Sequence, residues 1–169
     1  MRSKYLSVIL YLWLYAGWFA CVMLGRSGLG VLSPLAPAIG WALFLWAFAP
    51  NRRECIILLL LCLGGMMADA LFLKLGLIHD PSGAVFPLWL LSLWLLFAPA
   101  IWLLARLFSR RLWLAALLGG VVGPLSYKSG EYFGVLTMQG VGAFAAYAVF
   151  WAFFLPLAIA WVGRNKVTS

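Results

Sequence analysis

The chain alternates between long apolar runs and short polar or turn-forming segments. Most apolar runs have about twenty residues, the length that an α-helix needs to cross the hydrocarbon core of a membrane. Pro124 interrupts the fifth run, but small residues keep helical spacing through it, which predicts one kinked helix. We predict a single domain, residues 1–169, that forms an all-α polytopic membrane helix bundle with six transmembrane helices. The expected helices cover about residues 6–24, 29–49, 56–78, 85–104, 112–134 and 141–162.

Composition agrees with this pattern. Of the 169 residues, 66% are hydrophobic and only 9% are charged, and the mean hydropathy is +1.06. This composition is typical of an integral membrane protein and not of a soluble domain. Arg2 and Lys4 before the first apolar run resemble the start of a signal peptide. That run is long for a signal and suits a membrane span, so we expect an uncleaved first helix.

The charged residues predict the orientation. The formal net charge is +8, from twelve basic and four acidic residues. With a cytoplasmic N-terminus, nine basic residues fall on the cytoplasmic side and three on the outer side, in line with the positive-inside rule. We expect both termini in the cytoplasm and, because the basic clusters suit lipid headgroups, no nucleic-acid partner. The cytoplasmic set is Arg2, Lys4, Arg52, Arg53, Arg106, Arg110, Arg111, Arg164 and Lys166, and the outer set is Arg26, Lys74 and Lys128.

Asp69 is the most unusual residue, because it lies near the middle of the third apolar run. An ionised aspartate at the centre of a membrane helix costs about 2.5–3.5 kcal/mol on insertion scales. It is therefore expected to face the protein interior, to find a partner or to stay protonated. We expect its carboxyl group to point towards residues 126–131 of the fifth helix. Tyr127 and Ser126 are the expected neutral hydrogen-bond partners.

Two kinds of residue are expected to serve helix packing. Glycines on the third and fifth helices would let backbones approach closely, so we expect these two helices to cross. The glycines concerned are Gly65, Gly76, Gly119, Gly123 and Gly130. Ten tryptophans are present, and enrichment of this residue at membrane interfaces, together with packing, is a sufficient explanation for them.

The outer half of the predicted bundle gathers most of the unusual polar side chains, which we take as the candidate functional polar cluster. Its members are Asp69, Lys74, His79, Asp80, Ser126, Tyr127, Lys128 and Glu131. A simpler interpretation is a structural contact between Asp69 and Tyr127 or Lys128. The remaining members would then be ordinary side chains of loops or of the headgroup region.

Metal and redox chemistry have no support in the sequence. The chain has three cysteines and one histidine, with no C-x-x-C motif and no cluster at metal-ligand spacing. Cys55 and Cys62 on one helix are separated by about 10 Å along its axis, too far for a disulfide. We expect no metal site and no cofactor, and the sequence identifies no catalytic residue.

Three motifs carry a family resemblance: G-x-x-x-D at 65–69, P-x-W-L-x-x-L-W-x-x-F at 87–97, and G-P-L-S-Y at 123–127 followed by Gly130 and Glu131. They resemble an uncharacterised family of small polytopic bacterial inner-membrane proteins, a domain of unknown function, over nearly the whole chain. The resemblance implies a multi-pass protein of the bacterial inner (plasma) membrane. It also implies a lipid context, since family members look like neighbours of genes for cyclopropane-type fatty-acyl modification.

Three hypotheses for the function follow. The first is a non-catalytic lipid-associated, transport or accessory component with a polar site in the outer half of the bundle. The alternative is a membrane-embedded enzyme that modifies a lipid at the outer leaflet, with His79 or Asp69 as acid or base. Lys74, Lys128 or Arg26 would hold a phosphate group in that enzyme. The third is a proton-coupled cycle at Asp69.

The expected partners are the lipid bilayer and a bound phospholipid. A homo-oligomer or a membrane partner protein stays open, because six helices enclose little interior volume. The surroundings of Asp69 discriminate between the hypotheses. A cavity that reaches Asp69 would favour transport or chemistry, whereas a dry Asp69 bonded to neutral partners would favour a structural role.

Overall fold

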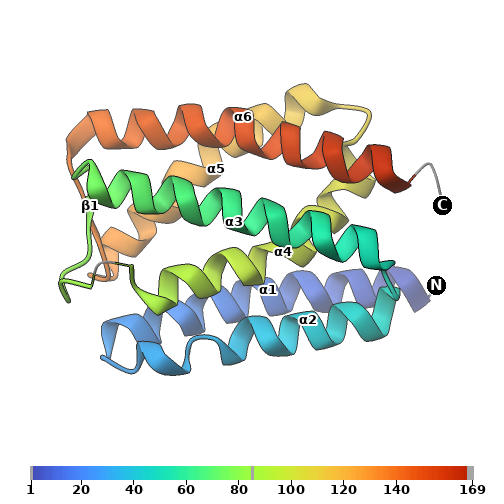
Figure 1. Cartoon of the computed structure of the whole chain (residues 1–169), viewed down its shortest axis with the longest axis horizontal. Coiled ribbons are helices and arrows are strands. Elements are labelled where there is room, and N and C mark those ends of the chain that lie inside the picture. The colour runs from blue at the N-terminus through green and yellow to red at the C-terminus, as the bar shows by residue number, and fades with distance from the viewer. Residues whose placement is uncertain (1, 85, 167–169) are drawn as a thin grey trace.

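The computed structural model describes residues 2–84 and 86–166, which form a bundle of α-helices with two very short strands (Figure 1). The prediction of an all-α bundle is confirmed, with six α-helices among the described residues. The helices are α1 (Arg2–Arg26), α2 (Leu35–Phe48), α3 (Arg52–Lys74), α4 (Leu88–Phe108), α5 (Leu112–Tyr132) and α6 (Gly140–Lys166). A 3-10 helix, η1 (Gly30–Leu32), and the strands β1 (Ile78–His79) and β2 (Thr137–Met138) lie in the connections.

The two ends of the bundle differ. Both termini lie at one end, together with the α2–α3 and α4–α5 connections (Figure 1), and we call it the terminal end. The opposite end, the strand end, holds the α1–α2 connection and the two strands. The strands are antiparallel, with Ile78 opposite Met138, and so tie the α3–α4 loop to the α5–α6 loop.

Five helical stretches are long and apolar enough to cross a membrane: α1, Gly30–Phe48 (η1 with α2), α3, α4 and α6. The remaining helix, α5, has 21 residues and runs from the terminal end to the strand end (Figure 1). Polar and charged residues in its last two turns lower its hydropathy. The chain is therefore a multi-pass membrane protein, in which helices satisfy the backbone hydrogen bonds internally.

The third helix begins earlier than predicted because of a capping box. The Asn51 side chain accepts a hydrogen bond from the Glu54 backbone N–H, and the Glu54 carboxylate accepts one from the Asn51 backbone N–H, both at 2.9 Å. This reciprocal pair satisfies donors that the first turn of a helix leaves free. The predicted start near residue 56 is thus moved to Arg52.

Other helix bounds also differ from the predicted ones. The expected helix 29–49 is divided between η1 and α2. The third helix ends at Lys74, where Gly76 adopts a left-handed φ of 69°, so that Ile78 lies in β1 and not in the helix. The predicted start of the fourth helix at Val85 lies outside the described residues, and α4 begins at Leu88, directly after Pro87.

The helix α4 lies at the centre of the bundle and contacts α1, α2, α3 and α6, whereas α5 packs mainly on α6. The expected close crossing of the third and fifth helices is therefore wrong. Gly119 and Gly123 of α5 face the backbone and ring of Trp151 in α6, and Gly65 of α3 faces the ring of Trp94 in α4. The glycines do allow close approach, but to different neighbours from those expected.

Candidate functional site

Asp69 is fully buried where α3, α4, α5 and α6 meet. The Trp94 indole N–H of α4 donates to its Oδ2 at 2.6 Å. The Tyr127 hydroxyl of α5 donates to the two carboxylate oxygens at 2.8 and 3.0 Å. The Tyr147 hydroxyl of α6 donates to Oδ1 at 2.9 Å. One carboxyl group thus connects four helices.

The inward orientation of Asp69 and its contact with Tyr127 agree with expectation. Ser126 does not reach it, because its hydroxyl donates to the carbonyl of Gly123 at 2.6 Å. Tyr147 was missed by the sequence reasoning, since its helix carries no other unusual polar residue within the apolar stretch.

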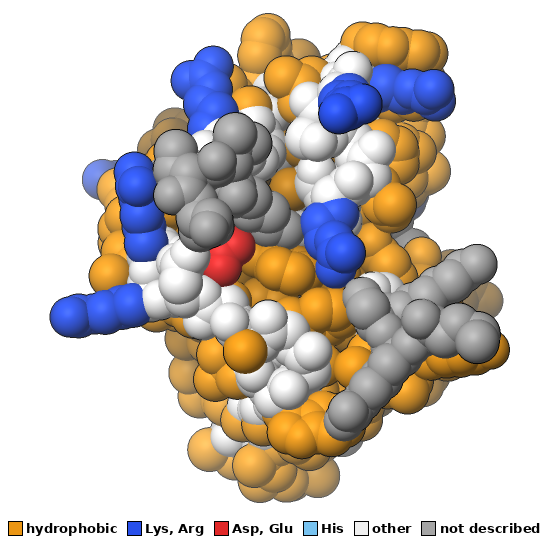
Figure 2. Space-filling model, turned by 90° about the vertical axis from the view of Figure 1, so that its right-hand side faces the viewer, with side chains coloured by type: hydrophobic (Ala, Val, Ile, Leu, Met, Phe, Trp, Pro, Cys, Tyr) orange, Lys and Arg blue, Asp and Glu red, His pale blue; other side chains and the backbone are white. Residues whose placement is uncertain are grey.

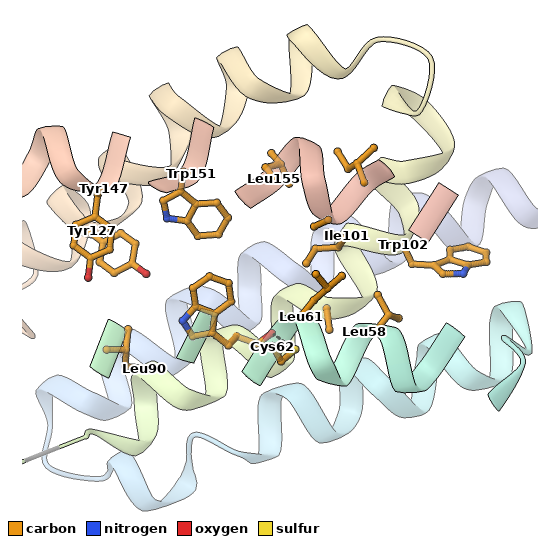
Figure 3. Packing of buried hydrophobic residues seen from close by; sticks show 14 of the residues in the cluster. Leu58, Leu61, Cys62, Leu90, Ile101, Trp102, Tyr127, Tyr147, Trp151 and Leu155 are labelled. Atoms are coloured by element: carbon orange, nitrogen blue, oxygen red, sulfur yellow. Dashed lines mark hydrogen bonds between the residues drawn. The ribbon is translucent and has the colours of Figure 1, made fainter. Parts of the chain in front are cut away.

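Aromatic side chains surround this carboxyl group and bury it fully. Tyr127 and Tyr147 stack with ring centroids 3.8 Å apart. Trp94 stacks on Trp151, with centroids 5.2 Å apart and planes inclined by only 2°. Figure 3 shows Tyr127 and Tyr147 side by side, with Trp151 next along α6. A fully buried carboxyl group that is bonded to three neutral donors favours a structural role for Asp69.

Asp69 is the middle member of a series of acid–tryptophan contacts, which we call the acid–indole ladder. An indole N–H can only donate, so each tryptophan of α4 satisfies its donor on a carboxylate from α3 or from the loop after β1. Three of the four acidic residues of the chain are used in this way. The pairs are Glu54–Trp102 at 2.9 Å, Asp69–Trp94 at 2.6 Å and Asp80–Trp89 at 3.1 Å.

The other candidate residues lie at the strand end and do not converge on Asp69. Lys128 and Glu131 form an ion pair within α5, and Glu131 also accepts a hydrogen bond from the Met138 backbone N–H at 3.4 Å. Across the strand pair, the His79 Nδ1 and Gln139 Nε2 atoms are 3.3 Å apart. These contacts join the loops at that end of the bundle.

Two further members of the predicted cluster, Lys74 and Asp80, also do not contact Asp69. Lys74 is exposed in the last turn of α3. Asp80 belongs to the acid–indole ladder, and its second oxygen accepts a hydrogen bond from the Ser82 backbone N–H at 2.7 Å. Of the eight candidate residues, the structure brings together only Asp69 and Tyr127 by direct contact in the interior.

Within residues 2–84 and 86–166, no three His, Cys, Asp or Glu side chains are grouped so that they could hold a metal ion. The three cysteines are free. Cys62 donates to the carbonyl of Trp94 at 3.1 Å, and Cys21 donates to the carbonyl of Ser33 at 3.6 Å. Both thiols therefore serve local packing between neighbouring helices.

An apolar groove, which the sequence did not indicate, separates α1 from α5 and has α4 as its floor. We call it the α1–α5 groove. These two helices make few direct contacts, and the cavity between them has a volume of about 540 Å³. Along α4 it extends from Trp89 to Phe108, about 28 Å at the helical rise of about 1.5 Å per residue. This length is close to the hydrocarbon thickness of a bilayer, about 30 Å.

Two polar atoms among the residues that line the groove are buried without a hydrogen-bond partner in the described part of the chain. They are the Tyr11 hydroxyl of α1 and the Trp151 indole nitrogen of α6. The remainder of the lining is almost entirely aliphatic and aromatic. Asp69 does not line the groove, because the rings of Trp94 and Tyr127 lie between them.

The terminal end of the bundle is strongly basic. Figure 2 shows this end, with Lys and Arg side chains spread around it and a single small acidic patch. The described arginines here are all exposed, whereas Glu54 is buried against Trp102. They are Arg52, Arg53, Arg106, Arg110, Arg111 and Arg164.

Comparison with known proteins settles the family. Residues 7–157 match the family described as "Protein of unknown function (DUF2878)". The chain belongs to the DUF2878 family. The resemblance to an uncharacterised family is thereby confirmed. No curated protein and no solved structure matches the chain.

Proposed function

We propose that this DUF2878 protein is a non-catalytic, lipid-associated membrane component whose α1–α5 groove holds a lipid acyl chain. The observation that carries the proposal is the groove itself, which is apolar and about as long as the hydrocarbon core of a bilayer is thick. Its volume of about 540 Å³ lies within the range of about 300–1,000 Å³ that is common for ligand sites.

The surroundings of the groove support a lipid occupant. Groove-lining residues of α5, such as Leu118 and Val122, are exposed on the outside of the bundle. In a membrane, that surface contacts hydrocarbon, and acyl chains are the apolar molecules available to fill the groove. Packing of such chains against a fixed apolar surface is favoured by van der Waals contact, as it is between membrane helices.

The use of the polar residues supports a non-catalytic role. Asp69 is already bonded to Trp94, Tyr127 and Tyr147, and the strand-end candidates are bonded to one another or exposed. The charge distribution further supports a bacterial inner-membrane location with the terminal end in the cytoplasm, since that end carries the arginines.

Lipid mass spectrometry on the purified protein tests this proposal. Leu118→Trp adds bulk inside the groove, whereas Leu117→Trp adds the same bulk on an exposed neighbouring position outside it. After exchange into detergent, we expect bound lipid in the wild-type protein and in Leu117→Trp, and at least a several-fold loss in Leu118→Trp. Equal lipid content in the two variants, or none in the wild type, would overturn the proposal.

A further inference from the structure

We infer that the groove selects an anionic glycerophospholipid, with its headgroup at the terminal end against the arginines of the α4–α5 turn. This inference rests on the proposed function and adds the class and the orientation of the lipid. It depends on the different charges at the two ends of the groove.

At the terminal end, the groove borders the α4–α5 turn. The last groove-lining residue of the floor is Phe108, and the first of the α5 wall is Ala115. Arg110 and Arg111 lie between these two residues and are both exposed. Arg106, one turn earlier, lies over the ring of Trp102, 5.4 Å from its centroid, and so away from the groove lining.

At the strand end, the charges near the groove offset one another. Lys128 is paired with Glu131 within α5. Arg26 ends the α1 wall, and Asp80 accepts a hydrogen bond from Trp89, the first residue of the groove floor. This end therefore carries no net charge near the groove, whereas the α4–α5 turn carries Arg110 and Arg111, for which the described residues supply no ion-pair partner.

A phosphate group suits the arginines. A guanidinium group can donate two parallel hydrogen bonds to one phosphate, a geometry that fixes the headgroup as well as attracting it. Basic residues at a membrane surface also attract anionic lipids in general. The α4–α5 turn differs from other basic positions at this end because it stands directly at the mouth of the groove.

The dimensions are consistent with this orientation. An acyl chain reaches through one leaflet, about half of the hydrocarbon thickness of about 30 Å. Along α5, Leu118 lies about 10 Å and Val122 about 17 Å from Arg111 at about 1.5 Å per residue. A chain whose headgroup contacts the turn would therefore pass Leu118, end near Val122, and cover the unpartnered Tyr11 hydroxyl on the opposite wall.

The test is native mass spectrometry of the full chain in detergent with an equimolar mixture of phosphatidylglycerol and phosphatidylethanolamine. The informative variant is the double substitution Arg110→Gln and Arg111→Gln. The matched control is Arg52→Gln and Arg53→Gln, which removes the same charge from the same end but at the start of α3, away from the groove.

We expect the wild type and the control to bind the anionic lipid with a preference on the order of tenfold, from two surface cations. We expect the turn variant to bind as much lipid in total without this preference. A preference that survives in the turn variant, or that falls equally in the control, would overturn the inference. A wild type without preference would overturn it too, whether or not the variants fold. Lipid bound without preference would leave the proposed function standing, whereas no bound lipid in any sample would contradict both.

Discussion

Replacing Asp69 by leucine is expected to destabilise the bundle strongly. The substitution removes the acceptor of Trp94, Tyr127 and Tyr147, all of which are buried at the meeting point of four helices. Leucine offers no acceptor, and its side chain is larger than that of aspartate at a position enclosed by stacked rings. The substitution therefore removes contacts between α3 and each of the helices α4, α5 and α6.

The magnitude follows from the three donors. A buried donor left without a partner costs about 1–3 kcal/mol, so that three dry donors would cost about 3–9 kcal/mol. Hydrogen bonds between membrane helices contribute about 0.6 kcal/mol each on average, which gives a lower bound of about 2 kcal/mol. We expect the free energy of unfolding to fall by at least about 2 kcal/mol in Asp69→Leu.

Asp69→Asn should cost clearly less. Its amide oxygen can still accept from the Trp94 indole, and its NH₂ group can donate to the tyrosine hydroxyls, which accept as well as donate. Reversible unfolding in mixed micelles measures both variants, with the apolar substitution Leu63→Ala at an exposed position of the same helix as the control. A stability of Asp69→Leu within about 0.5 kcal/mol of the wild type would refute the reasoning, since even one lost hydrogen bond exceeds that value.

Three further predictions concern packing, the ladder and the topology. Gly65→Ala should lower the melting temperature, because the added Cβ would collide with the indole ring of Trp94. Gly64→Ala adds its Cβ in open space and should be neutral or stabilising. Equal shifts of the melting temperature in the two variants would contradict this prediction. Trp102→Phe should cost about 1–3 kcal/mol by leaving buried Glu54 without its indole donor, and an unchanged unfolding curve would count against the ladder. Reporter fusions should read cytoplasmic at the C-terminus and external in loop 80–84; the reverse pattern would refute the proposed orientation.

The helices and the orientation of Asp69 could be predicted because both depend on local pattern. An apolar run of membrane length forms a helix almost regardless of its neighbours, since the backbone must bond internally. The cost of a charge in the membrane likewise forces Asp69 inward whatever the neighbour is. Tyr127 was a reasonable partner because it lies at the same depth on another helix.

The acid–indole ladder and the groove could not be predicted in this way. The sequence places Lys74, His79 and Asp69 in the same half of the membrane. It does not determine how each helix is rotated about its axis or which helices are neighbours. Tryptophans are common at membrane interfaces, so Trp94 and Trp102 gave no sign of their acidic partners. The groove arises because α5 packs on α6 and not on α1. This arrangement depends on Gly119 and Gly123, which face Trp151 of α6.

Site-specific photo-crosslinking tests the lipid-binding groove most directly. A benzophenone amino acid is placed at Val122, which lines the groove, or at Val121, which is equally exposed but lies outside it. The protein is purified in detergent to dilute bulk lipid, irradiated and examined by mass spectrometry. A lipid adduct at position 122 and none at position 121 is the predicted result. Equal adducts at both positions, or no lipid adduct at position 122, would contradict a lipid bound in the α1–α5 groove.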